Sequence, residues 1–404
     1  MAQYKIKEIA SFIGRGVTPT YVDEGIRILN QKCIRNNVVS FEEAKFTDAE
    51  KKYTAQKVIR KNDILINSTG AGTLGRVGLY DSDEECLCDS HVSILRLMDY
   101  TPDGIRIEPK YVNYYLHLNE TLIESLGKGA TNQTELSGKD IGKINIDLPS
   151  YDIQKKIVEV VSRYEQLLYE NNCQIEKLIN LAEQIYREWF VRFRYPGYKS
   201  HVVKNGLPEN WSIKRIMEIG EVVGGGTPST DVEEYWNGDV PWLSPVDLNT
   251  FKEVMISSGG SFITELGLKC SSAKMLPINT VLLSSRAPIG YVAIAKNKIS
   301  TNQGFKSVIC NSELIHYYYL YFFFKTSKTT LESYASGATF LELSGGRLKK
   351  IKIMVPPIEL QNKFAEIIDP FIRKTDILAM QNKALERQMA LILPRLMSGK
   401  QKVI

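Results

Sequence analysis

Amide side chains gather beside glycines in two segments of the chain, and amides can read the edge of a nucleic-acid base. Asn and Gln each present a donor and an acceptor, which matches adenine, whereas Arg and Lys match guanine. Any one of these residues is equally well explained as part of an ordinary polar turn, so the hypothesis depends on the whole set. The two segments are Thr131-Asn132-Gln133-Thr134 and Thr301-Asn302-Gln303-Gly304-Phe305-Lys306.

Glycine-rich turns and the ends of expected strands supply the rest of the candidate set. Glycine has no side chain, so a backbone that contains it can approach a phosphate closely. Arg15 stands between two glycines, and Thr227 follows three. The candidate DNA-contacting residues are Arg15, Gly16, Thr18, Asn67, Ser68, Thr69, Arg76, Asn132, Gln133, Gly225, Gly226, Thr227, Ser284, Ser285, Arg286, Asn302, Gln303 and Lys306.

The elements that must position these residues occur twice. Residues 129–138 recur at 337–345, and both copies contain Glu-Leu-Ser-Gly. Expected strands at 63–68 and 280–285 also correspond, and each precedes a turn glycine, Gly75 or Gly290, and a second apolar strand. The turns at 14–19 and 224–228 correspond if Val17 is an insertion. A period of roughly 200 residues indicates domain duplication, which suits a two-fold partner such as duplex DNA.

A long helix is expected after each copy. Between 151 and 193 the apolar positions alternate in steps of four and three, the heptad pattern of a coiled coil, and Asn171 falls on that seam, where a buried polar residue fixes the register. The second helix, at 357–397, has a stripe that includes Ile367, Lys374, Gln381 and Gln388, and Pro370 should bend it. The expected helix-pair or subunit interface comprises Val161, Leu168, Asn171, Ile175, Leu178, Ile185, Leu378, Leu385 and Ile392.

These patterns predict an α+β fold with a pseudo-two-fold internal repeat. Two tandem globular α/β domains occupy residues 1–150 and 205–355, and each is followed by a helix, at 151–194 and 356–398. We expect the two helices to pair as an antiparallel coiled coil rather than to pack separately, because their sequence context is duplicated.

Composition limits the class of protein. The chain has 404 residues, 43% of them hydrophobic and 24% charged, with a net charge of +5. These values are ordinary for a soluble protein, and the mildly basic balance permits a nucleic-acid partner without requiring one. The sequence shows no membrane span and no signal peptide, and its six scattered cysteines suit reduced thiols in the cytoplasm.

Three motifs suggest chemistry, but structural roles explain them better. The glycines of segment 70–75 match GxGxxG, but a strand is expected next instead of the helix that a dinucleotide site needs, so we interpret the segment as a mobile or DNA-facing turn. Cys86, Cys88 and His91 give only three local metal ligands, so buried free thiols are expected and no metal. The aromatic run at 316–324 has a counterpart at 111–117, so we interpret it as a core helix rather than a base-stacking platform.

The sequence contains no recognisable catalytic machinery. We find no Ser/His/Asp set, no paired-carboxylate motif and no phosphate-binding Walker loop. The segment Val355-Pro356-Pro357-Ile358 does not supply the Asn/Asp-Pro-Pro-aromatic motif of amino-methyltransferases. A nuclease of the Asp…Glu-x-Lys type is not ruled out, although no segment stands out as one.

The whole pattern resembles the specificity subunit of type I restriction–modification systems, and the resemblance covers essentially the entire chain. It is carried by the turns Gly226-Thr227-Pro228 and Gly16-Val17-Thr18-Pro19, by the Gly-Ala-Thr…Leu-Ser-Gly segments, and by the helix opening Pro356-Pro357-Ile358-Glu359-Leu360-Gln361. The first copy departs from the last of these motifs, since Ser150 follows Pro149 and can cap the helix instead.

The resemblance implies a non-catalytic reader of double-stranded DNA. Each globular domain would be a target-recognition domain that reads one half of a split, asymmetric site, and the helices would act as a spacer. It also implies partners: two methylation subunits and the restriction and translocation subunits, which would carry S-adenosylmethionine, ATP and Mg, with no cofactor on this chain. Exposed helix seams could drive self-association of the isolated chain.

Three alternatives stay open. The chain could be the reader part of a fused restriction enzyme, it could be a methyltransferase or nuclease, or its duplicated units could form an adaptor that binds protein. Missing motifs argue against the second alternative, whereas the mild charge leaves the third available.

Overall fold

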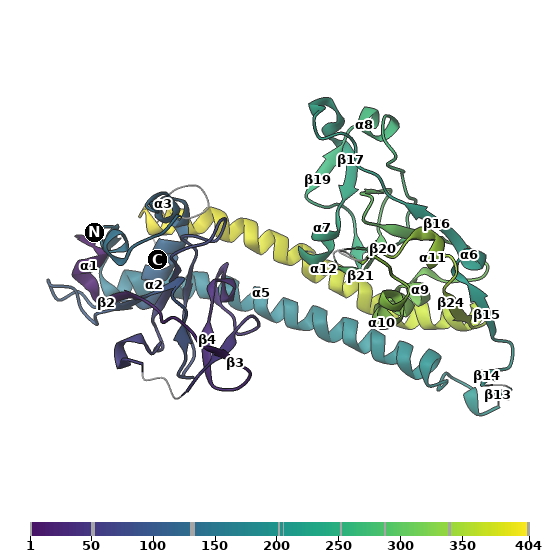
Figure 1. The fold of residues 1–404 in the computed structure, drawn as a ribbon, viewed down its shortest axis with the longest axis horizontal. Helices are drawn as coiled ribbons and strands as arrows, with labels where there is room; N and C mark the ends of the chain where they lie inside the picture. The colour runs from purple at the N-terminus through teal and green to yellow at the C-terminus, as the bar shows by residue number, and fades with distance from the viewer. Residues whose placement is uncertain are drawn as a thin grey trace. The chain divides into compact units, whose positions relative to one another are not determined.

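The computed structural model describes residues 2–49, 53–129, 134–200, 203–204, 206–250, 253–286, 288–337 and 341–401. The chain divides into two compact units. The first unit contains residues 1–167 and 385–404, and the second contains residues 168–384. Each unit therefore holds one globular part together with segments of both long helices (Figure 1).

A six-stranded mixed sheet forms the centre of the first unit. Its strand β8 lies inside the sheet, so Ile64, Leu65 and Ile66 are fully buried, and helix α2 packs on the neighbouring strand β9. The strand order is β2 (Ala10–Arg15), β11 (Val92–Leu97), β8 (Ile64–Asn67), β9 (Val77–Leu79), β6 (Asn37–Val39) and β5 (Ile34–Arg35). A second sheet has the order β10 (Leu87–Cys88), β4 (Ile26–Leu29), β7 (Lys45–Thr47) and β3 (Tyr21–Val22), and β1 (Ala2–Lys5) pairs with β12 (Asn145–Leu148). The helices are α1 (Ile6–Ile9), α2 (Pro109–Leu118), α3 (Glu120–Ser125) and α4 (Gly138–Ile141), with 3-10 turns at Gln31–Cys33 and Ala55–Lys57.

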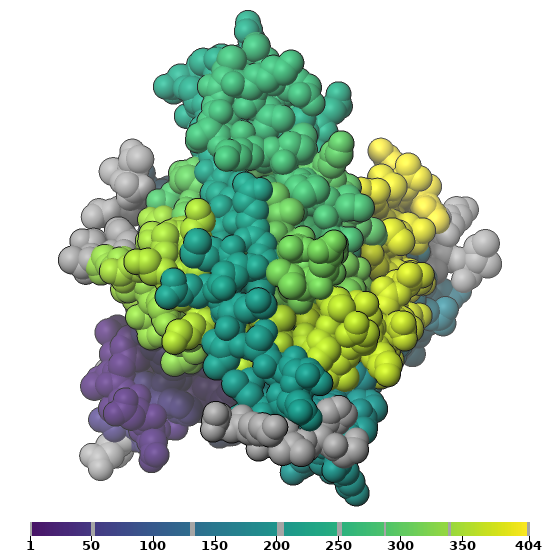
Figure 2. Space-filling model, turned by 90° about the vertical axis from the view of Figure 1, so that its right-hand side faces the viewer, coloured from purple at the N-terminus to yellow at the C-terminus, as the bar shows by residue number. Residues whose placement is uncertain are grey.

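The second unit repeats this plan with a five-stranded sheet. Helices α9 and α10 pack on β21, and a lobe made by β17, β19 and α8 projects from the unit (Figures 1 and 2). The main sheet has the order β16 (Gly220–Gly224), β23 (Lys306–Cys310), β20 (Val281–Ser285), β21 (Ile289–Ala295) and β18 (Met255–Ile256). The lobe sheet has the order β19 (Ser261–Ile263), β17 (Trp236–Leu243) and β22 (Ser300–Thr301), while β15 (Ser212–Arg215) pairs with β24 (Lys352–Val355) and β13 (Val203–Lys204) with β14 (Leu207–Pro208). The helices are α6 (Ile216–Ile219), α7 (Pro245–Thr250), α8 (Glu265–Lys269), α9 (Tyr317–Thr326), α10 (Lys328–Ser333) and α11 (Gly345–Leu348), with 3-10 turns at Tyr198–Ser200 and Glu233–Tyr235.

Equivalent hydrogen bonds confirm the predicted duplication. The hydroxyl of Tyr111 donates to the carbonyl of Asp147 at 3.1 Å, and that of Tyr319 donates to the carbonyl of Met354. These two tyrosines tie the core helix of each unit to the strand that leads into the long helix. The aromatic run that contains Tyr319 is a buried core helix, α9, as the sequence predicted.

The backbone pattern corrects one detail of the repeat. Val17 and Gly226 donate equivalent hydrogen bonds, to the carbonyls of Cys88 and Thr301, each at 2.8 Å. Val17 therefore occupies the position in the first unit that Gly226 occupies in the second, and the interpretation of Val17 as an insertion was wrong. Glycine is required in the second unit because a Cβ at 226 would lie 2.3 Å from the Oγ of Ser272, a lobe residue.

The two long helices are α5 and α12. Helix α5 spans Tyr151–Tyr186 and continues as a π-helical turn over Arg187–Val191, and α12 spans Ile358–Met397 without a break at Pro370. Every seam position predicted in α5 is buried or half-buried. The stripe predicted in α12 was wrong at Ile367, Lys374, Gln381 and Gln388, which are exposed. Beside the first three of these, the buried positions are the next residues, Ile368, Thr375 and Asn382. Two of these three are polar, so a search for apolar side chains could not find them.

A pair of buried amides joins the helices within the second unit. The Nδ2 of Asn171 donates to Asn382 Oδ1 at 2.8 Å, and the Nδ2 of Asn382 donates to Asn172 Oδ1 at 2.9 Å. The rings of Tyr186 and Phe364 lie 6.1 Å apart, so α5 and α12 run antiparallel in this unit. Asn171 is therefore the buried polar seam residue that the heptad pattern predicted.

A buried glutamine fixes the beginning of each long helix. Gln361 is fully buried, its Oε1 accepts the N–H of His316 at 2.9 Å, and its Nε2 donates to the carbonyls of Leu314 and Pro356. Gln154 makes the same three contacts in the first unit, with Glu108, Arg106 and Pro149. Each glutamine ties the helix to the loop before the core helix.

Candidate DNA-recognition edges

The candidate residues of the second unit meet at one edge of its main sheet. Strand β23 pairs antiparallel with both β16 and β20, so the ends of β16 and β20 meet the beginning of β23. This arrangement places Gly224, Ser285 and Lys306 together with the turn at 301–305 that precedes β23. We call these residues, with Arg286 and Glu342, the second edge.

The first unit forms the equivalent edge. Strand β11 pairs antiparallel with β2 and β8, which brings Arg15 at the end of β2 and Asn67 at the end of β8 to the beginning of β11 at Val92. We call these residues, with Ser68, Thr69, Ser93 and Glu135, the first edge. Segments that lie far apart in the sequence thus converge at the same place in both units.

A glutamate pairs with the cations at each edge. Arg15 forms an ion pair with Glu135 in the first unit, and its guanidinium also donates to the carbonyl of Leu136 at 3.1 Å. In the second unit the Nζ of Lys306 lies 3.6 Å from a carboxylate oxygen of Glu342, and Arg286 lies 4.0 Å from the same carboxylate. Both edges therefore carry cations whose charge is compensated within the chain.

Four predicted contact residues are buried, and the structure corrects their assignment. Asn67, Ser68, Ser284 and Ser285 have 0% exposure, because they lie at strand ends inside the sheet. Asn67 donates to the carbonyl of Gln31, Ser68 bonds Ser93, Ser284 bonds Pro288 and Tyr291, and Ser285 donates to the carbonyl of Gly304. Because these side chains are fully buried, they are not available for contacts with bases.

The edge glycines are explained by the fold itself. A Cβ on Gly16 would lie 2.0 Å from the carbonyl oxygen of Cys88, and a Cβ on Gly225 would lie 2.0 Å from that of Asn302. The close backbone approach that glycine allows is therefore made to the protein's own chain. This removes the need for a phosphate to explain these glycines.

The other candidates remain at the surface or half-buried. Thr69 bonds the ring of His91 at 2.7 Å, Arg76 donates to the carbonyl of Gly72, Thr227 donates to Gln303, and Asn302 accepts the N–H of Gly304. Gln303 and Thr18 are exposed, which leaves them accessible to a ligand. Asn132 and Gln133 lie outside the described residues.

Sequence reasoning missed two kinds of residue at the edges. Glu135 and Glu342 were overlooked as site residues, although a glutamate before Leu-Ser-Gly in both copies was a usable signal. Lys57 was also missed: its ammonium donates to the carbonyls of Arg15 and Gly16, each at 2.7 Å. No local pattern marks Lys57, because its partners lie about forty residues earlier in the chain.

Burial shifts the pKa values of ionisable groups beside the first edge. Burial raises the pKa of Asp89, and it raises the pKa of the Cys86 thiol to about 11, so this thiol stays protonated at neutral pH. Cys86 and Cys88 are buried free thiols, as predicted. Across the described residues, no group of three potential ligands is placed to hold a metal ion.

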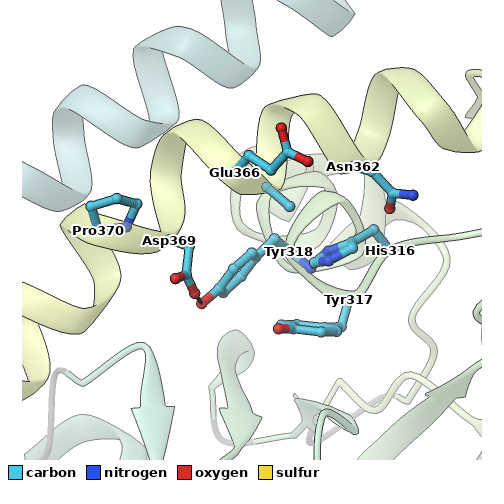
Figure 3. A pocket seen from close by; sticks show the side chains of 8 residues that line it. His316, Tyr317, Tyr318, Asn362, Glu366, Asp369 and Pro370 are labelled. Carbon is cyan, nitrogen blue, oxygen red and sulfur yellow. Dashed lines mark hydrogen bonds between the residues drawn. The ribbon is translucent and has the colours of Figure 1, made fainter.

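A hollow of about 480 Å³ lies between α9 and α12 in the second unit (Figure 3). The Tyr318 hydroxyl donates to Asp369 at 3.0 Å, and Arg373 pairs with the same carboxylate. Burial lowers the pKa of His316 to about 4, so the ring is neutral, and its Nδ1 accepts the N–H of Tyr318 as a helix cap. His316 thus has a structural role that accounts for its position.

Fold and site together define a protein of two tandem mixed-sheet domains, each with a polar, cation-bearing edge and each joined to a long helix. The sequence matches the family described as type I restriction modification DNA specificity domain over residues 1–181 and 208–387, and the chain belongs to this family.

Individual relatives agree with that assignment. The MjaIX specificity subunit of a type I restriction enzyme from Methanocaldococcus jannaschii is 42% identical over 201 residues, which are 49% of this chain and 46% of that protein. The chain thus matches about half the length of this relative. The HindI specificity subunit from Haemophilus influenzae is 23% identical over 85% of this chain and 88% of its own. In fold, the chain resembles the type I restriction–modification S subunit from M. genitalium, with a TM-score of 0.56 and 18% identity over 98% of this chain and 95% of that one. Within the described residues, no helix is long and apolar enough to span a membrane.

Proposed function

We propose that this chain is the DNA-recognition subunit of a type I restriction–modification complex, in which each edge reads one half of a split, asymmetric site. The observation that carries the proposal is the duplicated edge, where the equivalent strand ends of both units present a cation paired with a glutamate. The second edge also presents the exposed amide of Gln303. Arg and Lys match guanine, and Gln matches adenine, so these groups suit base edges in a major groove. The chain itself performs no catalysis in this proposal.

The proposal assigns chemistry to partner subunits. Two methylation subunits would carry S-adenosylmethionine, and restriction and translocation subunits would use ATP and Mg, while this chain binds none of these cofactors. It would act in the cytoplasm, where chromosomal DNA is accessible. Helices α5 and α12 would serve as the spacer between half-sites, since each contributes residues to both units.

The test is methylome sequencing of a methylation-deficient host that expresses the chain with its methylation subunit. A split methylated motif should appear with the chain and disappear when the chain is omitted. Removing one heptad from each helix should change the length of the spacer and leave both half-sites unchanged. If the complex assembles and no motif appears, the DNA-reading role is refuted and a protein-binding adaptor becomes the better explanation.

The assignment of half-sites to units can be tested in the same host. Gln303→Ala removes an exposed amide at the second edge and should relax one half-site only, because a lost base contact costs about 1–3 kcal/mol. Gln388→Ala, an exposed glutamine on α12, is the matched control and should leave the motif intact. Relaxation of both half-sites by Gln303→Ala would contradict the assignment of one unit to one half-site.

A further inference from the structure

The glutamates at the two edges have fixed backbones and accessible carboxylates. The N–H and carbonyl of Glu135 both bond Lys128, each at 2.9 Å, and those of Glu342 both bond Ser336, at 2.9 and 3.1 Å. The residue after each glutamate is a fully buried leucine. The two glutamate side chains nevertheless remain 55% and 40% exposed. A half-exposed side chain on an anchored backbone is well placed to hold a neighbour in one position.

Glu135 is directed at an edge cation rather than at the lysine that its backbone contacts. Lys128, the backbone partner of Glu135, is paired through its ammonium with Asp140 at 3.1 Å. Hydrogen bonds from Lys143, Ser137 and Lys128 hold the pKa of the Asp140 carboxyl well below its usual range. Since Lys128 is engaged with this charged carboxylate, Glu135 pairs with Arg15.

The two units supply the cation from opposite strands of the same pair. Arg15 on β2 stands opposite Ser93 on β11, whereas Gly224 on β16 stands opposite Lys306 on β23. Cross-strand partners lie only about 5 Å apart, so either member of the pair can place a charge at nearly the same point. The two units thus form the ion pair between cation and glutamate from different strands. This indicates that the ion pair, rather than the strand that supplies the cation, is the shared feature of the edges.

We propose that Glu135 and Glu342 are positioning residues that restrain the edge cations from binding non-specific DNA. The inference rests on the proposed DNA-reading function. A phosphate must compete with the glutamate carboxylate for the cation. The cation then exchanges one anionic partner for another and gains no additional contact. The edge of a guanine offers two acceptors to the same cation, so a matching base can displace the glutamate where a lone phosphate does so poorly. The glutamates would therefore raise specificity at the expense of non-specific affinity.

The test compares Glu135→Gln and Glu342→Gln in the complex with the methylation subunit. Each variant should bind a duplex without either half-site more tightly than wild type. The slope of log affinity against log salt should steepen by about 0.9 per released cation. Glu135→Gln releases Arg15, whereas Glu342→Gln releases Arg286 and Lys306. Between 50 and 200 mM salt, this corresponds to additional losses of affinity of about 3.5-fold and about 12-fold respectively.

The methylome supplies a second readout that a structural role would not change. Glu342→Gln should relax the half-site that Gln303→Ala relaxes, and Glu135→Gln should relax the other. Glu332→Gln is the matched control, since Glu332 forms an exposed ion pair with Lys328 on α10, outside both edges. If Glu342→Gln unfolds, Glu342→Asp, which keeps the charge on a shorter side chain, should show a smaller change of the same sign.

The outcomes separate the two proposals. A wild-type complex that yields no methylated motif would overturn the proposed function. A wild-type motif together with glutamine variants whose salt slope and half-sites match those of Glu332→Gln would overturn the positioning role alone. Equal relaxation of both half-sites by one variant would also overturn it, because each glutamate contacts the cations of one edge only.

Discussion

Replacing the buried glutamine Gln361 by leucine tests whether the beginning of α12 depends on this side chain. The amide Oε1 accepts the N–H of His316 at 2.9 Å, and Nε2 donates to the carbonyls of Leu314 and Pro356 at 3.0 and 2.8 Å. Leucine is of similar size but has no polar atoms. The substitution therefore leaves three backbone groups, one buried and two half-buried, without this partner while it keeps the volume nearly constant.

The magnitude follows from those three groups. A buried polar group that loses its partner costs about 1–3 kcal/mol, and the apolar burial of leucine offsets about 1–2 kcal/mol of the total. We therefore expect Gln361→Leu to lower the free energy of unfolding of the second unit by about 2–7 kcal/mol. Gln381→Leu, an exposed glutamine on the same helix, should change it by less than about 0.5 kcal/mol.

Tryptophan fluorescence makes the assay specific to one unit. All four tryptophans of the chain, Trp189, Trp211, Trp236 and Trp242, belong to the second unit. Urea unfolding followed by tryptophan fluorescence should show a lower midpoint for Gln361→Leu than for the wild type. The equivalent change in the first unit, Gln154→Leu, should shift the transition seen by far-ultraviolet circular dichroism more than the one seen by fluorescence. The reasoning is refuted if the fluorescence midpoint of Gln361→Leu equals that of Gln381→Leu.

Three further changes have defined outcomes. Asn382→Leu should lower the free energy of unfolding by about 1–3 kcal/mol because it leaves the buried amide of Asn171 without a partner. Leucine at both positions should lower it by less than the sum of the two single changes, and additive shifts of the urea midpoint would contradict the pairing. The pKa of His316 is depressed in the folded chain to about 4, so the contribution of its neutral ring to the free energy of unfolding is fully present above about pH 6.5. This free energy should fall by up to about 2 kcal/mol as the pH drops toward 4. His316→Asn keeps a capping side chain without that titration and should flatten the acid side of the melting-temperature profile, while an unchanged profile would exclude His316 as the cause. Gly226→Val should lower the free energy of unfolding by at least about 2 kcal/mol because its Cβ would clash with Ser272, and thermal melting should show the loss. A melting temperature equal to that of the wild type would show that the lobe adapts to the added side chain.

The sequence predicted the parts of the fold that depend on local patterns. Heptad spacing located α5 and α12 and placed Asn171 on the seam, because a helix brings residues seven apart onto one face. The internal repeat located the strand ends, since corresponding segments keep their order in both copies. The stripe of α12 failed at Thr375 and Asn382 because polar side chains fill buried positions there.

The candidate site was less accessible to sequence reasoning. Polar residues at strand ends were expected to face DNA, yet Ser68 and Ser285 are buried. Ser68 bonds Ser93 on the adjacent strand, and Ser285 donates to the carbonyl of Gly304 in the turn before β23. Whether such a side chain points into the sheet depends on the register of strands that are distant in the sequence. The ion pair of Arg15 with Glu135 likewise joins residues 120 positions apart, so no local window contains it.

Position-by-position comparison of the two copies also hides the shared feature of the edges, because the cation moves between strands. Arg15 aligns with Gly224, and Ser93 aligns with Lys306, so each aligned position differs although each pair carries one cation. If the charge at this point matters more than the residue that supplies it, Lys306→Ser should flatten the salt slope of non-specific DNA binding by about 0.9 in the Glu342→Gln variant, where Lys306 is released from its glutamate. Adding Gly224→Arg should restore the slope, since a Cβ at 224 would have no neighbour closer than the Lys306 side chain at 4.0 Å. Failure of the double variant to recover, with an unchanged melting temperature, would show that β23 alone can present the cation.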